Sequence, residues 1–244
     1  MIRQIEELSM NAWPALQTLL YDGWVLRFAN GYTKRANSIH PLYPSSADSS
    51  EKIAACEQLY RNRNQSTVFK MTSSVQPDEL DTLLAQRGYQ FDSPTSVQLL
   101  DLGQIKGSKT PRSKVSGTLS EAWLADCCRL SGIEKRHHST LRKILDSPRA
   151  ETGFLSIQED GQTIACGMGA VQDKFVGLFD IVTDANHRNQ GYGYQLVSDL
   201  LAWGRERGAE SAYLQVMLNN PPALRLYSKL GFKEYYTYWY RIGR

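Results

Sequence analysis

The sequence has few cysteines and no metal-binding spacing. Only four of its 244 residues are cysteines, and no Cys-x-x-Cys pair or zinc-like cysteine and histidine pairing occurs among Cys56, Cys127, Cys128 and Cys166. Cys127 and Cys128 are neighbours in a helical stretch, so their side chains point in different directions and are poorly placed to form a disulfide. We therefore expect reduced, structural thiols and no metal site.

The chain also lacks the features of membrane and nucleic-acid-binding proteins. No apolar run approaches the roughly twenty residues of a membrane span, and the N-terminus has no basic-then-apolar signal sequence. The 28 Lys and Arg residues against 25 Asp and Glu give a net charge of +3, too small to favour nucleic acid or an anionic membrane. These absences predict a cytoplasmic protein that binds neither, with enough length for one large domain or two small ones.

One strand-to-helix turn carries a phosphate-binding pattern, Arg188-Asn-Gln-Gly191-Tyr-Gly193. The apolar run at 178–183 is typical of a strand, and leucines recur at helical spacing over 194–207. The first N–H groups of a helix have no internal partner, and the helix dipole adds about half a positive charge there. Glycines let a phosphate approach the backbone, and the arginine adds a charged donor. The turn is therefore predicted to bind an anion.

Two better-known phosphate-binding turns do not fit this pattern. A Walker loop needs Gly-x-x-x-x-Gly-Lys-Ser/Thr, and a dinucleotide fingerprint needs Gly-x-Gly-x-x-Gly near the start of a βαβ unit. A helix that starts with glycines by chance is the remaining alternative. The sequence downstream argues against it, because residues 210–216 alternate like a strand, Asn219-Asn-Pro-Pro222 interrupts them, and 223–230 predict a short helix ending at Gly231.

Together the two motifs resemble those of the GNAT acetyltransferases, which hold acetyl-CoA. The Arg-x-x-Gly-x-Gly turn resembles their pyrophosphate loop, and the Asn-Pro break before Leu226-Tyr-Ser-Lys-Leu-Gly-Phe232 resembles the second half of their pattern. Both occur in the order that the family requires, over roughly the last half of the chain. The resemblance implies an α/β (α+β) class and a GNAT fold, in which helices flank a mixed, mostly antiparallel sheet.

The resemblance also implies which residues form the site. A backbone N–H on the strand before the loop would stabilise the oxyanion, and that strand edge would bond the pantetheine amides like an added strand. Tyr227 would protonate the departing sulfur, and Asn220 would contact the pantetheine arm. The implied cofactor-binding residues are Ile181, Val182, Thr183, Arg188, Asn189, Gln190, Gly191, Tyr192, Gly193 and Asn220.

Three of these residues also have structural explanations. Tyr227 could be a core residue of an amphipathic helix, and Asn220 could form a turn before two prolines. Arg188 could be a solvated charge on the surface. Their places within the two motifs favour a functional role for each.

The general base is less well determined by the sequence. Alignment on the glycines places Gly177 where some family members carry a strand glutamate. Asp180 is the nearest acid on the strand, but alternation points it opposite to Ile181, and only a β-bulge would re-aim it. Asp180 is therefore the base, a structural hydrogen-bonding residue or a partner for the other half of the chain. Alternatives lie in the loop predicted before a short helix at 141–145, and they are Glu134, His137 and His138.

The first half of the chain repeats the element order of the second. After a helix predicted over residues 6–20, residues 66–71 overlay the strand at 211–216, and 83–89 overlay 226–232. The first half therefore resembles a degenerate GNAT module, and the whole chain resembles the tandem-GNAT proteins of bacteria. Their N-terminal halves carry a segment similar to residues 22–37.

The chemistry of the first half is lost at the equivalent positions. At the position of the phosphate loop, the first half has Tyr43-Pro-Ser-Ser-Ala-Asp-Ser49, which contains no glycine. At the position that aligns with Tyr227, it has Leu84. We expect this half to bind no CoA and to serve as a packing partner or a wall of the acceptor cleft. The predicted domains are a degenerate GNAT-like domain at 1–104, a Gly-, Ser-, Pro- and Lys-rich linker at 105–115, and a GNAT acetyltransferase domain at 116–244.

The resemblance implies an acetyl-CoA-dependent N-acetyltransferase that acts on a primary amine of a small molecule or of a protein. One alternative is a non-catalytic module that binds acetyl-CoA and regulates a partner, and another is an enzyme whose donor is a different acyl-CoA. No acidic tract marks a polyamine site and no basic stripe marks nucleic acid. The sequence leaves open a monomer or a homodimer.

Overall fold

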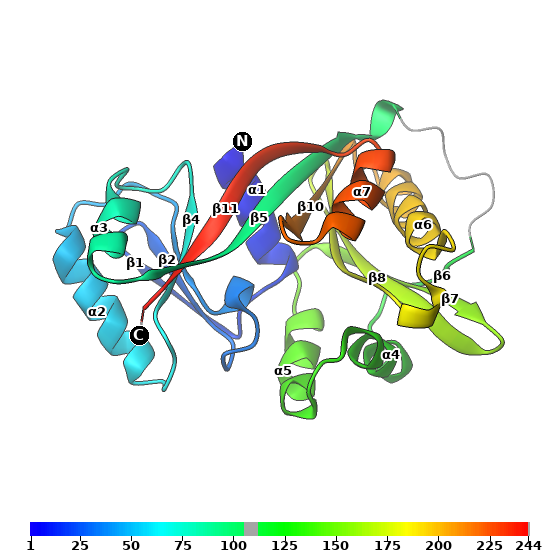
Figure 1. The fold of residues 1–244 in the computed structure, drawn as a ribbon, viewed down its shortest axis with the longest axis horizontal. Helices are drawn as coiled ribbons and strands as arrows, with labels where there is room; N and C mark the ends of the chain where they lie inside the picture. Colours follow the sequence, from blue (N-terminus) through cyan, green and yellow to red (C-terminus); the bar gives the residue numbers. More distant parts are fainter. Residues whose placement is uncertain (105–111, 244) are drawn as a thin grey trace. The chain divides into compact units, whose positions relative to one another are not determined.

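The computed structural model describes residues 1–104 and 112–243, and the chain forms two compact units (Figure 1). Unit 1 comprises Met1–Ser96, Met217–Asn219 and Tyr236–Arg244, and unit 2 comprises Val97–Val216 and Asn220–Tyr235. Of the predicted linker, residues 105–111 lie outside the described part of the chain. In the described residues, no helix combines the length and the apolar character needed to cross a membrane.

Unit 1 contains a sheet in which β3 and β4 run parallel and the other pairs run antiparallel. The order of its first strands is β1-β2-β3-β4. Its elements in chain order are α1 (Ile2–Ala12), β1 (Gln17–Tyr21), β2 (Trp24–Phe28), η1 (Lys34–Ala36), β3 (Ile39–Pro41), α2 (Ser49–Arg61), β4 (Val68–Thr72) and α3 (Leu80–Gln86).

The helix predicted over residues 6–20 is wrong in its second half. Helix α1 ends at Ala12, because Pro14 cannot continue a helix, and the residues that follow form β1. Asp22 and Gly23, with φ of 41° and 81°, make the two-residue turn that pairs β1 with β2. Turn chemistry therefore outweighed the apolar spacing from which the longer helix was predicted.

A buried ionic cluster joins α1 to the sheet of unit 1. Glu6 accepts hydrogen bonds from Lys70 Nζ at 2.6 Å and from the Tyr236 hydroxyl at 2.5 Å, and His40 Nδ1 lies 3.7 Å from its carboxylate. Burial alone would raise the pKa of Glu6, but Lys70 and His40 outweigh it and lower this pKa to about 2. The carboxylate is therefore held charged inside the unit.

Unit 2 contains an antiparallel meander of β6, β7, β8 and β9, next to which β10 runs parallel to β9. Its elements are η2 (Leu102–Gln104), β6 (Lys114–Ser116), α4 (Glu121–Ser131), α5 (Lys135–Leu145), β7 (Glu151–Glu159), β8 (Gln162–Gln172), β9 (Phe175–Thr183), η3 (Ala185–His187), α6 (Tyr192–Glu206), β10 (Ser211–Met217) and α7 (Pro221–Lys229).

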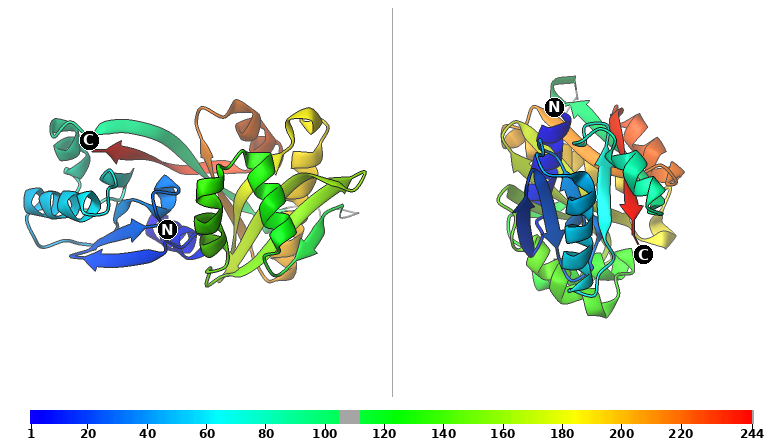
Figure 2. Two further views of the ribbon diagram at one scale, coloured as in Figure 1. Left: turned by 90° about the horizontal axis from the view of Figure 1, so that it is seen from below. Right: turned by 90° about the vertical axis from the view of Figure 1, so that its left-hand side faces the viewer.

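Helices α4 and α6 pack on opposite faces of the unit 2 sheet (Figure 2). A β-carbon added to Gly169 would lie within 3.1 Å of atoms of Trp203 and Leu200 on α6, so the absence of a side chain there lets the helix approach the sheet closely. On the other face, the indole of Trp123 in α4 donates to the Leu155 carbonyl at 3.0 Å. The predicted fold class is confirmed: helices flank a mixed, mostly antiparallel sheet.

The loop predicted at 135–138 is wrong, because these residues form the first turn of α5. Gly132, with φ of 65°, ends α4, and Glu134 is the N-cap of the next helix. The buried side of α5 consists of Thr140, Leu141, Ile144 and Leu145. The charged first turn lies outside this apolar pattern, which explains why spacing located only the end of the helix.

The two units repeat one order of elements. In unit 1 the parallel pair β3 and β4 is joined through α2, and in unit 2 the parallel pair β9 and β10 is joined through α6. Each then continues with a short helix, α3 or α7, and a long strand, β5 (Gln90–Asp101) or β11 (Lys233–Ile242). These last strands are exchanged, since β11 neighbours β4 and β5 neighbours β10. The predicted domains are continuous in sequence, whereas the compact units are not.

Candidate functional site

Strand β9 carries a bulge next to the predicted site. Its register against β8 shifts between Cys166 and Met168, where Asp180 and Ile181 together oppose Gly167. Asp180 has a left-handed backbone with φ of 49°, a conformation that aspartate adopts more readily than most residues. Such a bulge bends the strand and increases its twist.

Strands β9 and β10 pair along only part of their length, and their pairing ends just before the bulge at Asp180. Their parallel register runs from Phe175 opposite Ser211 to Leu178 opposite Leu214, and both strands continue beyond it. The last residues of β9, 179–183, therefore form a strand edge that has parted from β10. An extended ligand can add to such an edge through main-chain hydrogen bonds.

A short turn connects the end of β9 to α6. The Asp184 carboxylate accepts from the backbone N–H of Asn186 at 2.9 Å and lies 3.1 Å from Nδ1 of His187, and these hydrogen bonds, that of His187 first, lower the pKa of Asp184. Gly191 is the N-cap of α6, with φ of 89°. A β-carbon on Gly191 would meet no atom within 4 Å, so backbone conformation, not space, requires glycine there.

Gly193 lies where three elements converge. A β-carbon on Gly193 would be 3.4 Å from Cδ2 of Leu226 in α7 and 3.5 Å from Oγ1 of Thr183 at the end of β9. The two sequence motifs, separate in the chain, therefore meet at the first turn of α6. The structure brings together Thr183, Gly193 and the helix that carries Tyr227.

Arg188, Asn189 and Gln190 are exposed, and two of them bond to nearby backbone carbonyls. Arg188 Nε donates to the Thr183 carbonyl at 3.4 Å, and Gln190 Nε2 donates to the Asn186 carbonyl at 3.1 Å. Asn189 has φ of 60°. These bonds hold the side chains of Arg188 and Gln190 against the backbone of the turn.

Tyr192 differs from its neighbours in the loop. Its side chain is 8% exposed, and its hydroxyl donates to the Glu159 carboxylate at the end of β7. This hydrogen bond raises the pKa of Tyr192. The backbone N–H of Tyr192 can therefore bind an anion at the start of α6, while its side chain holds the helix against β7.

Tyr227 lies in α7 within the core of unit 2. Its ring centroid is 5.9 Å from that of Phe232, and burial raises the pKa of its hydroxyl to about 12. Among the described residues, this hydroxyl has no hydrogen-bond partner. Tyr227 thus combines the predicted core position with a hydroxyl that keeps its proton.

Asn220 is the N-cap of α7. Its Oδ1 accepts from the backbone N–H of Ala223 at 3.3 Å, and prolines follow at the first helical positions. The structural explanation of Asn220 is therefore observed, and its contact with a pantetheine arm stays a prediction.

Asp180 lies on the α4 side of the sheet. Burial raises the pKa of Cys128 in α4 to about 11, and the charges of Cys127 and Asp180 add to the rise. Ile181 points to the other face, because a β-carbon on Gly167 would be 2.5 Å from Cδ1 of Ile181 on the side of α6. The bulge is present, but Asp180 and Ile181 still face opposite sides.

The alternative bases lie at the start of α5. Glu134 is exposed and forms a 2.9 Å ion pair with Arg136, and His138 Nε2 lies 2.9 Å from the Ile133 carbonyl oxygen. His138 also lines a hollow of about 260 Å³ between α4 and α5. The other residues that line it are Glu121, Leu124, Ala125, Cys128, Ser139 and Arg142.

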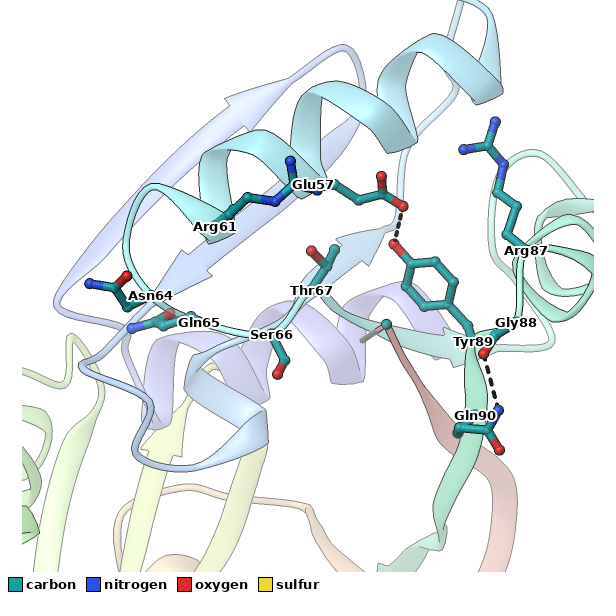
Figure 3. Close-up of a pocket in the computed structure, with 11 residues that line it drawn as sticks. Glu57, Arg61, Asn64, Gln65, Ser66, Thr67, Arg87, Gly88, Tyr89 and Gln90 are labelled. Atoms are coloured by element: carbon teal, nitrogen blue, oxygen red, sulfur yellow. Dashed lines mark hydrogen bonds between the residues drawn. The ribbon is translucent and has the colours of Figure 1, made fainter.

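A second hollow, of about 710 Å³, lies in unit 1 between the end of α2, the start of β4 and the turn before β5 (Figure 3). Its lining is polar, and Tyr89 points toward Glu57 and donates to it at 2.9 Å. Gln90 Nε2 donates to the Gly88 carbonyl at 3.0 Å. This hollow does not include the loop between β3 and α2, so it is not the repeat counterpart of the loop that contains Gly191.

The chain matches known proteins over its whole length. The family described as "Probable histone acetyltransferase Rv0428c C-terminal" matches residues 1–241. The "Uncharacterized N-acetyltransferase YobR" of Bacillus subtilis is 32% identical over 252 residues, which cover 100% of this chain and 99% of that protein.

Other similarities concern one half of the chain or the fold alone. The (ribosomal protein bS18)-alanine N-acetyltransferase of Escherichia coli is 30% identical over 121 residues, 48% of this chain and 81% of that protein. The solved structure of a GCN5-related N-acetyltransferase from Kribbella flavida superposes with a TM-score of 0.74 at 16% identity, and covers 99% of this chain and 95% of that one.

Proposed function

The chain belongs to the GNAT family of N-acetyltransferases, and on this premise we propose that it transfers the acetyl group of acetyl-CoA to a primary amine of a small molecule or of a protein. The observation that carries the proposal is the convergence, in unit 2, of the end of β9, the first turn of α6 and helix α7 at Gly193.

The residues of unit 2 fit CoA in shape and in charge. The left-handed Gly191 leaves the start of α6 open to a pyrophosphate, and the helix N-terminus and the exposed Arg188 complement its negative charge. The parted edge of β9 at 181–183 suits the pantetheine amides. Acetyl-CoA supplies an acyl group activated as a thioester. The proposed loop contacts also include Asn189, Gln190, Gly193 and the backbone of Tyr192.

The chain's own residues would serve the transfer in two ways. A backbone N–H of β9 beside Val182 is proposed to stabilise the negative charge that develops on the acetyl oxygen. Tyr227 is proposed to donate its hydroxyl proton to the leaving sulfur, because a pKa of about 12 keeps that proton in place at neutral pH. Asn220 is proposed to bind the pantetheine arm.

Asp180 is proposed as the general base, since it lies at the bulge where β9 leaves β10. One observation favours the alternative, a non-catalytic module that binds acetyl-CoA. Asp180 lies beside Cys127 and Cys128 of α4, on the face opposite to Ile181. A structural Asp180 would leave the chain without a base on β9.

We further propose that the first half, 1–104, is a degenerate GNAT-like module without a CoA site. The repeated order of elements supports this proposal. Residues 116–244 are proposed as the acetyltransferase domain.

The test is an acetylation screen that follows the release of free CoA thiol. The purified chain is mixed with acetyl-CoA and with aminoglycosides, polyamines or peptides with a free N-terminal alanine. Turnover with any of these amines, reduced in Tyr227→Phe, supports the enzyme. Binding of acetyl-CoA without turnover of any amine favours the non-catalytic module, and absence of binding contradicts both.

A further inference from the structure

The loop between β3 and α2 in unit 1 is the repeat counterpart of the loop between β9 and α6. Each loop follows the first strand of a parallel pair and precedes a long helix. Residues 42–48 form the loop in unit 1, and residues 184–191 form it in unit 2. The loop in unit 1 contains no glycine, yet it binds an anion.

That anion is the carboxylate of Asp22. It accepts from the backbone N–H groups of Ser46 at 3.0 Å and Ala47 at 2.9 Å, and from the hydroxyls of Ser45 at 2.8 Å and Ser46 at 2.9 Å. Lys52 in α2, whose side chain is 0% exposed, places Nζ 3.2 Å from the same carboxylate. Consecutive N–H groups, hydroxyls and a buried ammonium form the kind of nest that holds phosphate.

The β1–β2 turn is shaped to bring Asp22 into this nest. A β-carbon on Gly23 would collide with the carbonyl oxygens of Pro44 and Tyr43, so only glycine allows the turn to approach the loop this closely. Tyr43 N–H donates to the Gly23 carbonyl at 3.0 Å. The hydrogen bonds from Ala47 and Ser45, above all, hold the pKa of Asp22 well below its usual range, so the group in the nest is a carboxylate anion.

Lys52 is also fixed toward this nest. Its Nζ donates to the Asp22 carbonyl at 2.6 Å and to Ser45 Oγ at 2.5 Å, and it lies 4.0 Å from the ring centroid of Trp24. A buried ammonium needs a negative partner, because desolvation disfavours its charged form. The nest therefore requires an anion, whichever one it holds.

We propose that the β3–α2 loop is an anion site whose resident ligand is the chain's own Asp22 carboxylate, and that Asp22 excludes phosphate-bearing ligands from unit 1. Without Asp22, two N–H groups, two hydroxyls and Lys52 face a space that suits a tetrahedral oxyanion such as inorganic phosphate. CoA is one of the phosphate-bearing ligands that Asp22 would exclude, and only in this respect does the inference rest on the proposed function.

The experiment compares the response to inorganic phosphate of wild type, Asp22→Ala and Asp92→Ala. Asp92 is the matched control, because it bonds to Lys34 and Ser93 in unit 1 without a nest of backbone N–H groups from another loop. All three chains carry Gly191→Glu, which blocks the loop of unit 2. Melting temperature is measured against phosphate concentration, with chloride at equal ionic strength.

The expected result is a saturable rise of several degrees in the melting temperature of Asp22→Ala, beyond the general effect of phosphate on wild type and Asp92→Ala. Adding Lys52→Met to Asp22→Ala is expected to remove the rise. An equal response in all three chains overturns the proposal, and so does a rise that survives Lys52→Met.

Folding failure is informative as well. If Asp22→Ala folds only with phosphate, the free anion replaces the lost carboxylate, and the proposal is supported. If it stays unfolded with phosphate while Asp22→Asn folds, a free anion does not substitute for Asp22, and the proposal is overturned. The same holds if neither variant folds with phosphate. Because the probe is inorganic phosphate, this outcome is independent of whether unit 2 binds acetyl-CoA.

Discussion

Leu226 in α7 lies against Gly193 in α6, with its Cδ2 3.4 Å from the place that a β-carbon on Gly193 would take. This contact joins the two sequence motifs of unit 2, and it leaves room for a methyl group and for little more. It makes the first turn of α6 sensitive to side-chain size.

Gly193→Ala is expected to fold as stably as wild type, to within about 1 kcal/mol, because alanine is the better helix former and its β-carbon makes ordinary contacts. Gly204→Ala on the same helix is the contrast, because its β-carbon would lie 2.8 Å from Val176 and cost about 1–3 kcal/mol. Urea unfolding measures both. Equal losses in the two variants would contradict the described packing at the start of α6.

Tyr227→Phe is expected to lower kcat about 100- to 10,000-fold, since it removes the proposed proton donor. The dissociation constant for acetyl-CoA should change little, because the ring and its contact with Phe232 remain. Tyr43→Phe, which removes a hydroxyl bonded to Glu7 in unit 1, is the control. Steady-state kinetics with calorimetry separate the two effects, and an unchanged kcat would exclude Tyr227 as the donor.

The pH dependence of stability gives a second test of Tyr227. Its pKa of about 12 in the folded protein exceeds the ordinary value of about 10, so the folded state holds this proton more tightly. Its effect on stability is absent below pH about 10, and stability falls as the pH rises beyond that. Melting curves should show a smaller alkaline loss for Tyr227→Phe than for wild type.

Asp180→Asn tests the proposed base without disturbing the bulge, because asparagine also tolerates the left-handed φ of 49°. We expect kcat/KM to fall about 100- to 10,000-fold and the acidic limb of its pH profile to disappear. Asp173→Asn, with φ of 53° at the turn before β9, is the matched control. A loss of stability with unchanged kinetics would assign Asp180 a structural role.

Glu6→Gln is expected to destabilise the protein by about 3–5 kcal/mol, because it leaves Lys70 buried without its carboxylate. Glu7→Gln, on the exposed side of the same helix, should cost less than about 1 kcal/mol. The pKa of Glu6 is lowered from 4.5 to about 2, so its contribution is present above pH 4.5 and is lost as the pH falls toward 2. Urea unfolding at neutral and acidic pH should show the difference between the variants shrinking in acid.

Local signals in the sequence predicted much of unit 2. The turn at Gly191, the strand before it and the helix after it follow from glycine chemistry and apolar spacing, and the structure contains all three. The sequence could not show that the bulge at Asp180 leaves that residue facing α4, because strand twist depends on the neighbouring strand.

Non-local features of unit 1 were beyond sequence reasoning. Nothing in the sequence near Asp22 indicates that its carboxylate binds to the loop at Ser46, because its hydrogen-bond partners belong to the separate loop between β3 and α2. The exchange of β5 and β11 could not be predicted either, since each strand has the same local sequence pattern wherever it pairs.

In unit 2, the helical conformation of residues 135–138 was missed because their charged side chains lie on the exposed side of α5.

The most direct test of the central claim is calorimetric titration with acetyl-CoA of wild type, Gly191→Glu and Gly161→Glu. Gly161, with φ of 77° and no atom within 4 Å of an added β-carbon, matches Gly191 but lies in the turn between β7 and β8. We predict one site per chain in wild type and Gly161→Glu, and none in Gly191→Glu. Binding retained by Gly191→Glu, or no binding by wild type, would contradict a CoA site at the start of α6.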